Sequence, residues 1–220
     1  MGRLFAMGVS LLLAGAAVAQ STAIRLILGE GQKVYRKPAF GNYCVGFGMD
    51  RSFNDKLTAG LDVTFDVSHA LKAGPEYVYL ELSGNSIGYT MKPSMLSLNY
   101  HTEYALGDDD GTHGYIGTFI GLRFLKQKWT SDGYVNVDTY GNPISVPAPR
   151  PVSKMLVPLG IRFGVRGATD AGFMDLYCAM GYQIGGGKHL LSGEFAKQAV
   201  KYAETSPLAL TLGLAYGFGW

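Results

Sequence analysis

Two segments of the chain alternate strictly between apolar residues and small or polar ones. From Leu57 to Ser68 every second residue is apolar, and the last segment, from Leu208 to Trp220, follows the same rule. Successive side chains of a β-strand point to opposite faces, whereas a helix would scatter these apolar residues around its circumference. Both segments are therefore predicted to be strands with one apolar face.

Six further segments show the same period and are also predicted to be strands. They cover Asn42–Phe53, Glu76–Met91, Ser94–Ala105, Gly114–Lys126, Lys154–Gly167 and Phe173–Gly185. The alternation breaks from Ser83 to Gly88, which leaves the register of the third strand open, and Pro158 lies inside the sixth strand. Together the eight segments predict an all-β fold, an eight-stranded antiparallel up-and-down barrel.

Composition decides which face of such a barrel meets water. The polar faces consist largely of Gly, Ala, Thr and Ser, whereas the outer surface of a soluble, lipocalin-like barrel would be dense with Lys, Glu and Gln. Charged residues make up 16% of the chain, against about 25% in an average soluble domain. The apolar faces carry Tyr, Phe and Trp towards their ends, as lipid-facing strands with aromatic girdles do. A transmembrane β-barrel is therefore the favoured interpretation.

The N-terminus is typical of a cleaved signal peptide. Arg3 supplies the positive start, 4–16 the apolar run, and Ala17-Val18-Ala19 a small-x-small cleavage site. The apolar run is shorter than the roughly 20 residues of a spanning helix. We expect a signal peptide at 1–19, a periplasmic lead-in of no clear structure at 20–41 and the barrel at 42–220. The cysteines, Cys44 and Cys178, are expected to stay unpaired, since they lie on strands that are not neighbours.

The terminal residues Tyr216, Phe218 and Trp220 resemble the C-terminal assembly signal of outer-membrane barrels, which ends in an aromatic residue. With the signal peptide and eight strands, the chain is similar to the outer-membrane protein A and X type of small barrel. The resemblance covers about 42–220 and implies the outer membrane of a Gram-negative bacterium, insertion by the barrel assembly machinery, and no enzyme activity.

Connection lengths predict the orientation of the barrel. Connections expected after odd strands include the longest in the chain: 54–56, a turn near Lys92, 127–153 and 186–207. Those expected after even strands are shorter as a set: 71–75, 107–113 and 168–172. Because bacterial barrels carry short turns in the periplasm and longer loops outside, both chain ends are expected to be periplasmic.

The inward faces of the predicted strands collect charged residues: Asp62, Asp66, Glu81, His101, Glu103, Arg123, Arg162, Arg166 and Asp175. Charges in so narrow a lumen must pair or meet trapped water. We expect a closed lumen in which Asp66 and Arg162 pair across the axis. A small gated pore is the alternative.

A lipid A-modifying enzyme is a further alternative, because Ser97, His101 and Glu103 share one face of a predicted strand. Same-face residues four apart lie roughly 13 Å apart, too far for a hydroxyl to reach the imidazole. No catalytic, cofactor or metal residue is therefore predicted, and the balanced formal charge of +2 gives no reason to expect nucleic acid.

The function expected from these features is structural or adhesion-like surface interaction. The expected partners are outer-membrane lipids and lipopolysaccharide, contacted by Lys188, His189, Lys197 and Lys201, the barrel assembly machinery, and an extracellular ligand at loop 127–153. That loop combines aromatic residues with stiffening prolines, and such a surface suits contact with another molecule: Trp129, Tyr134, Tyr140, Pro143, Pro147, Pro149 and Pro151.

Overall fold

The computed structural model of the chain describes residues 21–35, 42–68, 77–82, 85–107, 111–131, 151–186 and 205–219. These residues form nine strands: β1 (Ser21–Tyr35), β2 (Asn42–Ser52), β3 (Leu57–Asp66), β4 (Tyr77–Leu82), β5 (Asn85–Leu106), β6 (Thr112–Ser131), β7 (Val152–Thr169), β8 (Gly172–Ile184) and β9 (Thr205–Gly219). They contain no helix that is long and apolar enough to cross a membrane.

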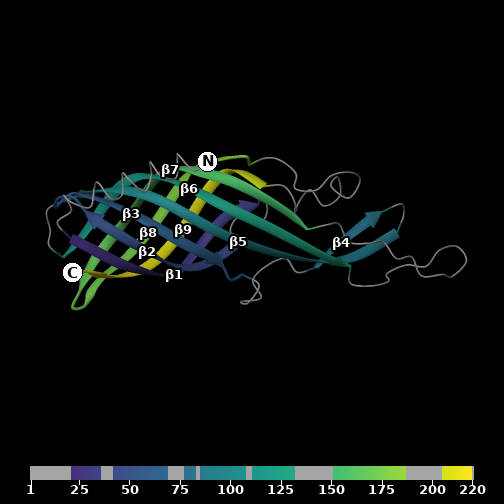
Figure 1. Cartoon of the computed structure of the whole chain (residues 1–220), viewed down its shortest axis with the longest axis horizontal. Coiled ribbons are helices and arrows are strands. Elements are labelled where there is room, and N and C mark those ends of the chain that lie inside the picture. Colours follow the sequence, from purple (N-terminus) through teal and green to yellow (C-terminus); the bar gives the residue numbers. More distant parts are fainter. Residues whose placement is uncertain are drawn as a thin grey trace, which may run out of the picture.

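Eight of the strands close into an antiparallel barrel (Figure 1). β1 pairs with both β2 and β9, and the ring continues through β8, β7 and β6 to β5. The pairing of β3 with β5 completes it. β4 pairs with β5 alone and extends this hairpin beyond the barrel. The predicted fold class, an eight-stranded up-and-down barrel, is therefore confirmed.

The prediction that 20–41 is an unstructured lead-in is wrong, because β1 is a full member of the barrel. Ile24 and Leu26 face outward, with 43% and 44% of their side-chain surface exposed, while Arg25 and Ile27 are buried inside. A register shift after Ile27 then inverts the alternation, so that Glu30 faces inward. This bulge places apolar residues on both faces and hides the period of two.

The predicted third and fourth strands are also wrong in their bounds. The segment predicted as Glu76–Met91 is divided between β4 and the start of β5, and β5 continues without a turn at Lys92. Pro93 lies inside β5, and among the described residues it pairs with Gln127 of β6 alone, since the ladder with β4 ends at Thr90 and that with β3 begins at Leu96. Proline lacks a backbone N–H to donate to a ladder, so it is tolerated where one edge of the strand has no neighbour among the described strands.

The remaining strand predictions are confirmed, and five of them match β2, β3, β7, β8 and β9 within three residues at each described end. β6 continues to Ser131, past its predicted end. Pro158 lies within β7, where it pairs with Gln183 of β8, and the ladder to β6 skips from Leu159 to Leu156. Both cysteines are free, on β2 and β8.

The connections around the ring alternate in length. Those after β2, β5 and β7 are short: 53–56, 107–111 and 170–171. Those after β6 and β8 are long, 132–151 and 185–204, and the connection between β3 and β5 contains β4. Residues 54–56 thus belong to the short-turn end, contrary to the prediction, because β1 shifts the strand count by one. Asn54 shapes this turn by accepting hydrogen bonds from the backbone N–H groups of Lys56 and Leu57.

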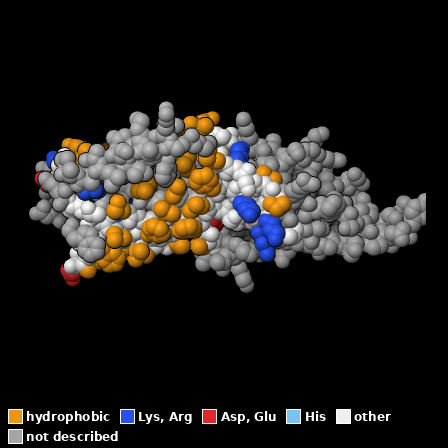
Figure 2. Space-filling view, in the orientation of Figure 1, with side chains coloured by type: hydrophobic (Ala, Val, Ile, Leu, Met, Phe, Trp, Pro, Cys, Tyr) orange, Lys and Arg blue, Asp and Glu red, His pale blue; other side chains and the backbone are white. Residues whose placement is uncertain are grey.

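The outer wall of the barrel is a band of exposed apolar side chains, which we call the apolar belt (Figure 2). Its members come from every barrel strand and include Leu26, Phe47, Leu61, Tyr100, Ile120, Ile161, Leu176 and Leu212. The inward residues of β9 are small and buried: Ala209, Thr211, Gly213, Ala215 and Gly217. Small residues on this wall leave room for long charged side chains from the opposite strands.

Candidate functional site

Eight charged or titratable side chains meet inside the barrel, and we call them the lumen cluster. They are Arg25 of β1, Asp50 of β2, Asp62 of β3, His101 and Glu103 of β5, Arg162 and Arg166 of β7, and Asp175 of β8. Arg166 is the least buried, with 12% of its side chain exposed, and the others are at most 4% exposed. The period of two aims each of them inward, and closure of the ring brings six strands together around them.

Arg25 lies at the centre of the lumen cluster. Its Nη2 donates to both carboxylate oxygens of Asp62 at 2.6 Å, and its Nη1 donates to Asp175 Oδ2 at 2.8 Å. Its Nε lies 3.5 Å from Asp50 Oδ1. The planar guanidinium presents donors in a fixed fork, so one arginine can serve carboxylates from three strands at once.

The two arginines of β7 extend the same network. Arg162 lies 3.0 Å from Glu103 and 3.3 Å from Asp62, and its guanidinium carbon stands 3.9 Å from the ring centroid of Tyr177. Arg166 pairs with Glu103 at 2.8 Å and with Asp50 at 3.0 Å. Each guanidinium therefore contacts several carboxylates, and desolvation of each ion is offset by counter-ions and by an aromatic face.

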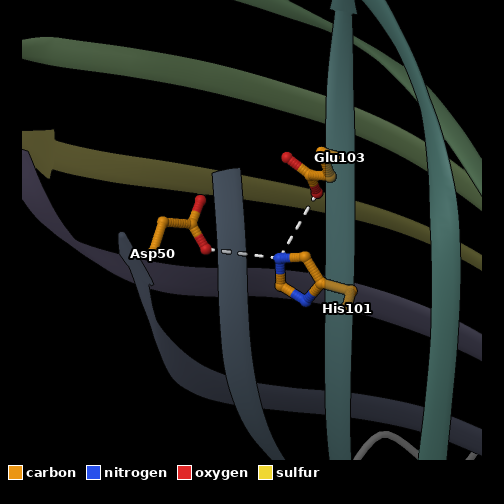
Figure 3. A group of neighbouring side chains, drawn as sticks. All are labelled: Asp50, His101 and Glu103. Carbon is orange, nitrogen blue, oxygen red and sulfur yellow. Dashed lines mark ion pairs between the residues drawn. The ribbon is translucent and has the colours of Figure 1, made fainter. Parts of the chain in front are cut away.

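His101 contacts three carboxylates through its two ring nitrogens, and Figure 3 shows two of them, those of Asp50 and Glu103, at the same nitrogen. Its Nε2 lies 3.3 Å from both Asp50 Oδ1 and Glu103 Oε1, and its Nδ1 lies 3.4 Å from Asp62 Oδ2. The cluster holds four carboxylates and three guanidinium groups, a formal excess of one negative charge.

Asp50, His101 and Glu103 also place one ligand atom each within 4.8 Å of one another, as a metal site would. The same carboxylates already contact Arg25, Arg162 and Arg166. A divalent cation would have to enter beside three fixed positive charges. The arrangement thus suits an internal ion-pair network better than a metal centre.

A second polar layer lies in the same lumen around Arg123. Its Nη1 donates to Gln183 Oε1 at 2.7 Å, and its Nη2 donates to Thr211 Oγ1 at 3.1 Å. Apolar side chains fill a further section: Val34, Cys44, Met95, Leu125 and Leu156. An interior cavity lined by Glu30, Asp62, Arg162 and their neighbours measures about 10 Å³, which is no more than the space of a single water.

The structure brings together six of the residues predicted for the lumen: Asp62, His101, Glu103, Arg162, Arg166 and Asp175. Arg123 is separate from them, in the second polar layer. The predicted pairing of Asp66 with Arg162 is wrong, because Asp66 accepts a hydrogen bond from Asn42 Nδ2 at 2.6 Å. Glu81 lies on β4, outside the barrel ring, and its side chain is outside the described residues.

Sequence reasoning missed Arg25, which contacts all four carboxylates of the lumen cluster, because the bulge in β1 hid its strand. Asp50 was also missed, although it lies on the inward face of β2, next to the outward-facing Met49. Ser97 donates to Gln32 Oε1 at 3.3 Å rather than to His101, so the Ser97, His101 and Glu103 set does not form a catalytic triad.

Tyr216 and Phe218, two of the three residues of the predicted assembly signal, lie on β9 with their rings in edge contact, 4.8 Å between centroids. Trp220 lies outside the described residues, as do Lys188, His189, Lys197 and Lys201 and most of loop 127–153.

No family model and no curated protein matches the sequence. Similar solved structures are small eight-stranded outer-membrane β-barrels. The N-terminal β-barrel domain of Pseudomonas aeruginosa OprF is 11% identical, with 92% of this chain and 98% of that chain covered and a TM-score of 0.45. Ail, the attachment invasion locus protein of Yersinia pestis, is 9% identical, with 91% and 97% covered and a TM-score of 0.46. Neisserial surface protein A is 10% identical, with 90% and 95% covered and a TM-score of 0.45. At these values none of the three carries a functional conclusion over to this chain.

Proposed function

We propose that the protein is a bacterial outer-membrane barrel that anchors surface loops, with a lumen closed by its own ion pairs. The observation that carries this proposal is the apolar belt, which exposes large side chains on all eight barrel strands. A monomeric soluble protein rarely exposes a contiguous apolar surface of more than a few hundred Å². In a bilayer the same surface contacts acyl chains, and the closed ring leaves no backbone edge unsatisfied.

The orientation follows from the connections. The short connections 53–56, 107–111 and 170–171 share one end of the barrel with the start of β1 and the end of β9. In bacterial outer-membrane barrels the short turns face the periplasm. Both termini are therefore assigned to the periplasm, and the long connections to the cell surface.

The closed lumen favours an anchor over a pore. Fully buried ion pairs span the interior between strands that are not neighbours, such as Arg25 with Asp62 and with Asp175. A permeating ion would have to break these contacts and leave charges without partners. We therefore assign the function to the surface of the barrel. Loop 127–153 contacts an extracellular ligand, the outer wall contacts lipopolysaccharide and other lipids, and the barrel assembly machinery inserts the chain.

Planar-bilayer recording tests the closed lumen. The purified, refolded protein is expected to give no stable conductance, whereas stable openings of uniform size would favour the small gated pore. Expression in a Gram-negative host tests the enzyme alternative, because a lipid A deacylase or acyltransferase would change the mass of lipid A. An unchanged lipid A mass spectrum is expected.

A further inference from the structure

Three exposed lysines stand together on the outer wall near the long-connection end of the barrel. Lys92 lies on β5, and Lys126 and Lys128 lie on β6; we call these three the basic cluster. In the register of the two strands Lys92 is directly opposite Lys128, and Lys126 is opposite Ser94. Figure 2 shows Lys and Arg side chains gathered just beyond one edge of the apolar belt.

The basic cluster begins two residues beyond the last apolar row of this wall, on the side of the long connections. That row joins register partners on β5, β6 and β7: Leu96, Phe124 and Met155. The next row towards the long connections lies two residues further along each strand. It is formed by Ser94, Lys126 and Ser153, all of them exposed. Two residues of strand span about 7 Å. An ammonium group flanked by two hydroxyl-bearing residues therefore stands where the hydrocarbon region would give way to head groups.

Within the part of the chain that the structure describes, Lys92, Lys126 and Lys128 form no ion pair with a carboxylate. Like charges directly opposite each other on neighbouring strands destabilise the pairing, as Lys92 and Lys128 do here. Inside the lumen, by contrast, every arginine of the lumen cluster contacts several carboxylates. An anion from outside the chain would offset the repulsion on the outer wall.

We infer that the basic cluster binds the phosphate groups of an outer-leaflet lipid head group. The acyl chains of that lipid contact the apolar row and the apolar belt beyond it. Its phosphates accept hydrogen bonds from the lysines and from Ser94 and Ser153. Lysine is a common phosphate ligand in proteins, acting as a compact positive charge. The inference rests on the proposed function, because only a membrane-inserted barrel holds this wall at head-group height. It specifies the class of lipid as a phosphorylated one.

The test is a titration of the refolded full chain in octyl glucoside micelles, a detergent without phosphate, with fluorescent bisphosphorylated lipid A. Each basic residue near an anionic membrane surface contributes about fivefold in affinity, so Lys126→Gln combined with Lys128→Gln should weaken binding roughly thirtyfold. Lys126→Arg with Lys128→Arg should retain binding. The single variant Lys128→Gln should weaken binding about fivefold. Lys56→Gln, which removes one charge from the short turn at the opposite end, is its matched control and should leave affinity unchanged.

Three results would overturn the inference. Dephosphorylated lipid A could bind as tightly as the phosphorylated form, the double glutamine variant could bind like the unmutated chain, or inorganic phosphate or soluble heparin could displace the lipid at equal concentration. A gel band that migrates differently before and after boiling confirms that each sample is a folded barrel. Loss of that band in the unmutated chain would refute the proposed function itself, whereas a folded barrel without phosphate preference refutes only this inference.

Discussion

Arg25 is the residue whose removal should damage the lumen cluster most. Its fully buried guanidinium contacts Asp50, Asp62 and Asp175, so Arg25→Gln leaves four carboxylates facing two guanidinium groups. Breaking a buried ion pair by removing one partner typically costs about 3 to 5 kcal/mol, because the remaining charge is buried without its counter-ion. We expect Arg25→Gln to lower the free energy of unfolding by that amount.

Asp62→Asn should cost less than Arg25→Gln, because it leaves three carboxylates facing three guanidinium groups. The double variant should be more stable than the sum of the two losses predicts, with a coupling of about 1 to 3 kcal/mol for groups in direct contact. Asp66→Asn is the matched control, since Asp66 is on the same strand but bonds to Asn42. Combined with Arg25→Gln it should be additive.

The assay is urea unfolding of each variant in detergent micelles or lipid vesicles, followed by far-UV circular dichroism and by the heat-sensitive gel band. Additive losses for Arg25→Gln and Asp62→Asn would refute the reasoning, because they would show that the two side chains do not interact in the folded barrel. An Asp66→Asn variant that couples to Arg25→Gln as strongly as Asp62→Asn does would refute it equally.

Three further changes test the wall, the packing and assembly. Leu212→Arg, on a belt residue with 51% of its side chain exposed, should destabilise the barrel in lipid by about 2 to 4 kcal/mol in urea unfolding, and a tolerated arginine would place this face in water. Gly213→Val should lower the free energy of unfolding by about 1 to 3 kcal/mol in the same assay, because a Cβ there would lie 2.2 Å from the Tyr177 ring. Gly29→Ala is the control and should leave stability unchanged, since nothing lies within 4 Å of a Cβ at that position. Equal effects of the two variants would contradict the packing of this wall. Deletion of 218–220 should leave periplasmic, protease-sensitive protein in cell fractionation. A normal yield of the deletion variant in the outer membrane would contradict the prediction that these residues are an assembly signal.

Regular strands could be predicted from the sequence, and the exceptions have physical causes. The alternation is regular in β3 and in the 208–219 part of β9, so local periodicity was sufficient for these segments. In β1 the bulge after Ile27 moves the inward face from odd to even positions, and a strict alternation test fails. The residues of β4 were predicted as part of a barrel strand, but among the described residues β4 pairs with β5 alone. Pairing is a non-local property that periodicity does not contain.

The lumen residues could be predicted as a set but not as pairs. Parity alone placed Asp62, Arg162 and Asp175 inside, as the structure has them. The choice of Asp66 as the partner of Arg162 depended on counting positions around the ring. The predicted third strand does not lie in the ring between β3 and β5, and β1 joins the ring on the other side, so β3 and β7 lie three positions apart and not four. Arg25 was not predicted to lie in the lumen. Because 20–41 was assigned to no strand, none of its side chains could be assigned to the inward or the outward face.

The central claim, a membrane-inserted barrel held by the apolar belt, is tested most directly by refolding the purified chain from urea into phospholipid vesicles and running it on a gel with and without boiling. A barrel inserted in the bilayer should fractionate with the vesicles, resist alkaline extraction and change its migration only after boiling. A chain that stays soluble in detergent-free buffer, does not fractionate with vesicles and migrates identically in both lanes would contradict the claim.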